Sequence, residues 1–293
     1  MIDTPDTAPL GQAFSAGREG GRRLRFSLGW ITRPVFGLAL AVIAASALWM
    51  GSFVLAAFVA LTIVLAAREW HRMVSGQLLT GEFFVTAIAV AAAVFSFAAW
   101  PGSVAPWLFV LAGAAVSLVL AVRHRRSPLW EAGGVLYLGV PALALVALRA
   151  MSVHGFLIVL AMFVAIWATD TGALVVGKLV GGPKLWPALS PNKTWAGAIG
   201  GMVFAIFAGG VVFSFLALNV VHGALFAAFV GAIAQVGDLF ESWAKRRFRI
   251  KDSGGLIPGH GGVLDRIDST LLVAPVLAVV VLVVQFDPLG ALI

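Results

Sequence analysis

Long stretches without a single charged side chain are the feature that most restricts how this chain can fold. Several runs extend for seventeen or more residues without Asp, Glu, Lys or Arg, and a helix needs about 20 mainly apolar residues to cross the hydrocarbon core of a bilayer. Apolar residues make up 61% of the 293 residues and charged residues 11%, whereas soluble domains average about 45–50% and 25%. The sequence therefore predicts an all-α, polytopic integral membrane protein.

Nine apolar runs are candidates for spanning helices. The first two adjoin, and one helix through both would be long for a single span. Gly51-Ser52 offers a tight turn between them, which favours a hairpin. The nine runs are residues 35–50, 52–67, 83–100, 104–122, 134–148, 155–176, 197–219, 222–241 and 265–286.

The basic residues indicate the orientation. With the N-terminus inside, all 20 Lys and Arg residues except Arg149 fall in cytoplasmic segments, as the positive-inside rule requires. We therefore expect the C-terminus outside, most naturally in a bacterial inner membrane. This topology explains most of the net charge of +7 and removes the main reason to expect nucleic-acid binding. We predict a cytoplasmic polar tail (1–33), N-terminal transmembrane helices (34–150) and a C-terminal catalytic transmembrane region (151–293).

Two polar stretches interrupt the apolar pattern before residue 201. Asp170 lies inside the sixth run, where a carboxylate is expensive and usually functional, although a polar residue that packs between helices is the alternative. Residues 181–201 are rich in Gly, Pro, Ser and Lys and precede a helix. Their backbone N–H groups, Lys193 and the helix N-terminus can bind a phosphate, but a plain connector fits the composition equally well.

The third polar stretch begins in the eighth run and continues to residue 269. Asp238, Glu241 and Lys245 share one helix face, and Asp265 and Asp268 are three apart at the start of the ninth run. An amphipathic helix end, and acids that complement a helix dipole, are the structural alternatives. Five glycines at 254, 255, 259, 261 and 262 let the backbone approach a ligand closely. Bases for phosphates and acids for Mg²⁺ together favour phosphoryl or nucleotidyl transfer.

These residues resemble a known enzyme signature. Ser242-x-x-Lys245-Arg246-x4-Lys251-Asp252, followed by Gly254 and by LIPGHGGVLDRID at 256–268, is similar to the signature of the phosphatidate cytidylyltransferases. The upstream stretches TDTGA, SPNKTW and GDLFES also resemble that family, so the similarity covers about residues 160 to 275. Two positions depart from the family pattern. Ala244 replaces a larger apolar residue, and Ala196 stands where Glu is common, so no acid role after Trp195 can be carried over.

The resemblance implies transfer of CMP from CTP to phosphatidic acid at the cytoplasmic face, giving CDP-diacylglycerol and pyrophosphate. It implies Mg²⁺, with room for a second, monovalent cation, and a polar cavity on the cytoplasmic side. CTP, phosphatidic acid and membrane lipids are the expected partners, nucleic acid is not, and a homodimer is left open. The implied catalytic residues are Asp238, Asp265, Asp268, Lys245, Arg246 and Lys251, with the three aspartates as metal ligands. The implied substrate-binding residues are Asp170, Ser190, Lys193, Thr194, Ser242, His260, Gly261, Gly262 and Arg266.

Other functions remain open at this point. Intramembrane acids such as Asp170 and Asp238 also mark ion pathways in transporters, but here the charged groups collect at the inner ends of the last four helices. A CDP-alcohol phosphotransferase is disfavoured because its Asp-x-x-Asp-Gly-x-x-Ala-Arg arrangement is missing. A polyprenol-phosphate kinase or cytidylyltransferase is chemically closer.

Overall fold

The protein folds into apolar helices joined by short turns and one small β-hairpin. The computed structural model describes residues 37–151, 154–256 and 261–283. The predicted 1–33 tail lies outside them. The helices are Gly37–Met50, α2 (Ser52–Ser75), α3 (Gly81–Ala99), α4 (Ala105–Arg123), α5 (Pro128–Met151), α6 (Gly155–Leu179), α7 (Trp195–Phe215), α8 (Val220–Arg247) and α9 (Leu264–Ala278), which continues as the π-helical turn η1 (Val279–Val283). Strands β1 (Lys184–Trp186) and β2 (Ser190–Thr194) pair antiparallel.

The all-α membrane prediction is confirmed. In the described part of the chain, each of the nine predicted runs contains a helix, and eight of these helices are long and apolar enough to cross a membrane. Helix Gly37–Met50 is shorter than the other eight. The sequence left a connector and a phosphate-binding loop open at 181–201, and no strand was predicted there. The structure forms two short strands, in which Thr194 pairs with Lys184 and Ser190 with Trp186.

The turn predicted at Gly51-Ser52 is present, and a distant arginine holds it. Gly51 and Ser52 both have positive φ, 62° and 44°, which ends the first helix. Nε of Arg149 on α5 donates to the carbonyl oxygen of Leu48 at 2.9 Å, and Nη2 donates to that of Trp49 at 3.3 Å. Arg149 thus satisfies carbonyl groups at a helix end, which would otherwise lack partners.

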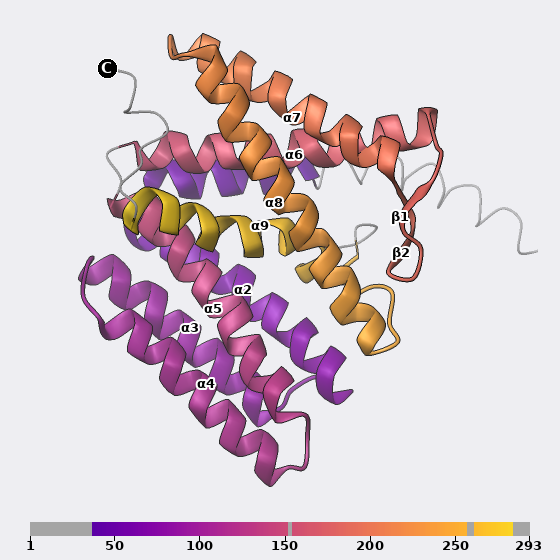
Figure 1. Cartoon of the computed structure of the whole chain (residues 1–293). Coiled ribbons are helices and arrows are strands. Elements are labelled where there is room, and N and C mark those ends of the chain that lie inside the picture. Colours follow the sequence, from indigo (N-terminus) through magenta and orange to yellow (C-terminus); the bar gives the residue numbers. More distant parts are fainter. Residues whose placement is uncertain (1–36, 152–153, 257–260, 284–293) are drawn as a thin grey trace, which may run out of the picture.

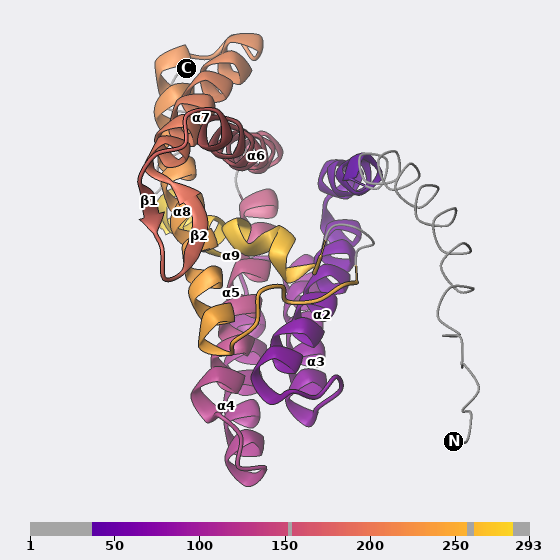
Figure 2. The ribbon, with the colours of Figure 1, turned by 90° about the vertical axis from the view of Figure 1, so that its right-hand side faces the viewer.

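The helices form two groups with α9 between them (Figure 1). Helices α2, α3, α4 and α5 pack against one another, and so do α6, α7 and α8. Helix α9 packs against α5 and α2 on one side and against α8 and α6 on the other. The segment that connects α8 to α9 crosses to α2 before it returns (Figure 2). Helix α9 and this segment therefore join the two halves of the chain.

Glycines allow α6 and α7 to approach closely. A Cβ on Gly200 would lie 2.4 Å from Cβ of Val176, and a Cβ on Gly201 would lie 2.6 Å from the carbonyl oxygen of Thr169. Small residues at a contact let membrane helices pack backbone to backbone. This contact fixes both ends of the hairpin that connects the two helices.

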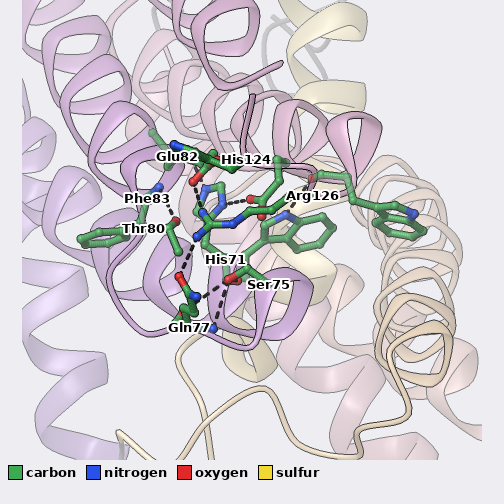
Figure 3. A network of polar contacts seen from close by, with 12 residues as sticks. His71, Ser75, Gln77, Thr80, Glu82, Phe83, His124 and Arg126 are labelled. Atoms are coloured by element: carbon green, nitrogen blue, oxygen red, sulfur yellow. Dashed lines mark hydrogen bonds and ion pairs between the residues drawn. The ribbon is translucent and has the colours of Figure 1, made fainter. Parts of the chain in front are cut away.

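A buried polar network explains why α2 continues past residue 67, where the apolar run was expected to end (Figure 3). His71 is fully buried and pairs with Glu131 of α5. Its Nε2 donates to Oγ1 of Thr86 at 2.7 Å, because that hydroxyl itself donates to the carbonyl oxygen of Glu82 at 2.8 Å. Burial of polar groups is tolerated when they have partners, so the helix carries these side chains inside.

A second part of the network closes the turn between α4 and α5. The buried Glu82 carboxylate pairs with Arg126 and, at 3.0 Å, with Nδ1 of His124. Arg126 also donates to Oε1 of Gln77 at 2.6 Å. These contacts link α3 to the α4–α5 turn and help to hold the N-terminal group of helices together.

Candidate functional site

An ion pair brings the hairpin to α8. Lys193 lies on β2, half-buried, and its ammonium group pairs with Oδ2 of Asp238 in the middle of α8. The hairpin reaches this place because Thr194 caps α7, accepting from the N–H of Gly197 at 3.0 Å. Two stretches that are about 40 residues apart in the sequence, SPNKTW and GDLFES, therefore meet in space.

A second ion pair joins the end of α8 to the start of α9. Nζ of Lys245 donates to Oδ1 of Asp265 at 2.9 Å and lies 3.4 Å from Oε1 of Glu241. The Asp265 carboxylate also accepts from the N–H of Gly262 at 3.0 Å and from that of Ser253 at 3.2 Å. Asp265 thus holds the described parts of the glycine-rich segment, residues 251–256 and 261–264, at two points.

Carboxyl groups gather beside these pairs. The side chain of Glu241 is 1% exposed, interacts electrostatically with Asp268 and accepts no hydrogen bond from described residues at either oxygen. Asp170 on α6 interacts electrostatically with Asp268 and Asp238. Three predicted site acids from three helices therefore share one neighbourhood, together with Glu241, whose role was not predicted.

The other predicted residues lie around this centre or next to it. Arg246 is exposed and donates from Nε to the carbonyl oxygen of Leu189 at 3.2 Å and from Nη1 to that of Ile250 at 3.1 Å, so it ties the hairpin to the end of α8. His260 lies outside the described residues. The remaining ones are Ser190 on β2, Thr194 at the start of α7, Ser242 half-buried on α8, Lys251 exposed after α8, Gly261 at φ 82°, Gly262 buried, and Arg266 exposed in the first turn of α9.

The sequence model of the cytidylyltransferase family matches residues 31–284. This chain belongs to the cytidylyltransferase family. The resemblance carried by the signature is thereby confirmed, and the match extends over the N-terminal helices, where the sequence offered only general hydropathy. The region that matches the family model therefore contains both groups of helices.

Curated relatives agree with the family assignment. A phosphatidate cytidylyltransferase of Brucella suis biovar 1 is 43% identical over 170 residues, which is 58% of this chain and 62% of that protein. The Bacillus subtilis phosphatidate cytidylyltransferase is 40% identical over 144 residues, 48% of this chain and 54% of that protein. That of Staphylococcus saprophyticus is 38% identical over 150 residues, 50% and 56% of the two chains. The matched segment thus spans less than two thirds of these relatives.

The carboxylate groups of the site are of the type that binds a metal ion, but their spacing in the described residues does not form a metal site. Carboxylate oxygens are the ligands that Mg²⁺ prefers. The Glu241 oxygens accept no hydrogen bond from described residues, and the Lys245 ammonium lies 3.4 Å from Oε1. In the arrangement of the described residues, no three His, Asp or Glu side chains are grouped so that they could hold a metal. The trio Asp238, Asp265 and Asp268 stays a prediction, and Asp265 already contacts Lys245 and two backbone N–H groups.

One cavity lies at the junction of the two halves. It has a volume of about 220 Å³ and none of the predicted site residues lines it. The predicted polar cavity on the cytoplasmic side therefore stays a prediction. The observed cavity is lined by the end of α2, the turn after it and part of the glycine-rich segment: Arg68, Glu69, Arg72, Leu78, Gly254, Gly255 and Leu256.

Sequence reasoning missed Glu69 on α2. It is 2% exposed and accepts hydrogen bonds from the glycine-rich segment. Its position two residues after an apolar run, next to Arg68, is typical of a helix end in water. Only the burial of a carboxylate beside that segment distinguishes it.

Proposed function

We propose that this protein transfers CMP from CTP to phosphatidic acid, forming CDP-diacylglycerol and pyrophosphate. The observation that carries the proposal is the meeting of the hairpin, the end of α8 and the start of α9 through the pairs Lys193–Asp238 and Lys245–Asp265. The family assignment and the names of the relatives support the same reaction.

The reaction needs charge neutralisation and alignment more than a strong base. A phosphate oxygen of phosphatidic acid attacks the α-phosphorus of CTP, a new P–O bond forms, and the bond to the β-phosphate breaks with its electron pair on pyrophosphate. Because the attacking phosphate is already an anion, no proton has to be removed first. Preorganised cations stabilise the charge on the leaving group.

The basic residues supply those cations. Lys193 and Lys245 now pair with carboxylates, so a polyphosphate would compete for ammonium groups that are already held in place. Arg246 and Lys251, both exposed, extend the positive charge. We assign phosphate contacts to these four residues, and we place Asp170, Ser190, Thr194, Ser242, His260, Gly261, Gly262 and Arg266 around the substrates.

A divalent cation is part of the proposal. Asp238 and Asp268 would hold Mg²⁺, with Asp265 as the third predicted ligand, and Mg²⁺ would neutralise phosphate charge when bound. A second, monovalent cation and a homodimer stay predictions. The location of nearly all Lys and Arg residues supports a cytoplasmic active site in a bacterial inner membrane.

The position of the label in CTP tests the reaction. Purified protein in detergent is mixed with phosphatidic acid, Mg²⁺ and CTP labelled at either the α- or the γ-phosphate. CMP transfer puts the α-label into lipid and the γ-label into pyrophosphate. A γ-label in lipid would instead identify a lipid kinase, and no turnover with any divalent cation, together with solute flux in vesicles, would identify a transporter.

A further inference from the structure

Glu69 connects the first half of the chain to the glycine-rich segment. Its Oε2 atom accepts from Oγ of Ser253 at 3.0 Å and from the backbone N–H of Leu264 at 2.9 Å. Ser253 follows α8, and Leu264 is the first residue of α9. One carboxylate oxygen on α2 thus holds the segment at two points separated by ten intervening residues in the sequence.

Two glycines of the segment lie directly against this carboxylate. A Cβ on Gly254 would lie 2.3 Å from Oε1, and a Cβ on Gly262 would lie 2.5 Å from Oε2. Neither distance can accommodate a side chain without a shift. A side chain at either position would therefore displace the Glu69 carboxylate from the place where it accepts its hydrogen bonds.

The contacts continue from Glu69 to the proposed site. Ser253 uses its hydroxyl group for Glu69 and its backbone N–H for Asp265, which in turn pairs with Lys245. A shift of Ser253 would therefore move the Asp265 carboxylate. Misplacement of reacting or binding groups by about 1 Å can reduce the rate about 100-fold.

The two oxygens of Glu69 differ, and this difference makes the role testable. Oε2 accepts both hydrogen bonds, whereas Oε1 is buried and has no hydrogen-bond partner among the described residues. A residue needed only for its negative charge would be expected to face a cation, and in the described residues Glu69 forms no ion pair. The contacts of Glu69 within the described residues are therefore those of a hydrogen-bond acceptor.

We propose that Glu69 is a positioning residue that fixes residues 251–256 and 261–264 so that Asp265 meets Lys245. The expected change in kcat rests on the proposed CMP transfer. The anchoring of residues 251–256 and 261–264 by Glu69 is independent of that function.

Three variants of the full chain in detergent test the proposal. Glu69→Ala removes the acceptor and lowers kcat about 10- to 100-fold, as loss of a supporting contact does. Glu69→Gln keeps an oxygen at the Oε2 position and retains kcat within about threefold, which fits an acceptor that works without charge. Glu82→Gln is the matched control: it changes a buried glutamate on α3 that contacts no part of the segment, and its kcat stays at the wild-type value.

Hydrogen exchange separates this proposal from the reaction itself. Glu69→Ala increases amide exchange in 251–256 and 261–264, including Leu264, whereas Glu69→Gln and Glu82→Gln leave it unchanged there. Wild-type exchange in Glu69→Ala, or equal loss of activity in the Gln and Ala variants, overturns the proposal. If wild-type protein transfers no CMP but exchange follows this pattern, the proposed function fails and the anchoring role stands.

Discussion

Lys245 and Asp265 meet across the glycine-rich segment, with 2.9 Å between Nζ and Oδ1. Lys245 lies in the last turn of α8 and Asp265 in the first turn of α9. Both side chains are largely buried, at 14% and 15% exposure. This pair sets the distance between two helix ends that both carry predicted catalytic residues.

Breaking this pair should stop catalysis. We expect Asp265→Asn to lower kcat about 100-fold or more, because a preorganised electrostatic contact near the reacting phosphates is lost. Expression and detergent extraction should remain normal, and the purified variant should elute from gel filtration at the wild-type position. A double-mutant cycle with Lys245→Ala should show coupling, since each substitution removes the same contact. Normal turnover in Asp265→Asn would contradict the role assigned to it.

Removal of divalent cations should abolish activity. We expect EDTA to stop CMP transfer and added Mg²⁺ to restore it, because carboxylates and phosphates share that ion. Asp268→Asn and Asp238→Asn should each raise the Mg²⁺ concentration needed for half-maximal rate. The measurement is a Mg²⁺ titration of both variants beside Glu82→Gln. Activity that persists in EDTA would rule out this part of the proposal.

The Glu82 network should contribute to stability without affecting chemistry. Glu82→Gln leaves Arg126 and His124 without their buried carboxylate, and loss of a buried partner costs about 1–3 kcal/mol. A lower melting temperature by intrinsic fluorescence, at unchanged kcat, is the expected result. The interpretation of Figure 3 as a structural network would be wrong if kcat fell and stability did not.

The contact between α6 and α7 should be sensitive to a single methyl group. We expect Gly201→Ala to destabilise the protein by about 1–3 kcal/mol, as overpacking does, because its Cβ would lie 2.6 Å from the Thr169 carbonyl oxygen. Gly133→Ala on α5 is the control, since a Cβ there meets nothing within 4 Å. It should be neutral or stabilise by up to about 1 kcal/mol. Thermal unfolding of both variants is compared, and equal stability would show that α6 and α7 adjust at no cost.

The sequence predicted the helices better than their ends. The thickness of the bilayer sets how many consecutive apolar residues a spanning helix needs. The length of an apolar run therefore predicts a helix, and each of the nine runs contains one. Their ends were misplaced where buried pairs carry polar residues inside, as at His71 and Glu131. The hairpin was missed because five of residues 181–191 are Gly or Pro, which indicates a loop rather than strands.

The candidate site could be predicted where its residues are close in sequence. Lys245, Asp265 and Asp268 fall within one signature, and Lys245 and Asp265 form an ion pair in the structure. Glu241 lay on the predicted polar face, yet only its burial beside Asp268 distinguishes it from an exposed acid.

By itself the sequence determined that this chain crosses a membrane as apolar helices and that acids, bases and glycines gather near its end, because hydropathy and local spacing are written in neighbouring residues. The tertiary structure alone decided that Glu69 meets Ser253 across a sequence separation of 184 residues. Such a contact depends on how α2 packs against α9, and no local pattern encodes it.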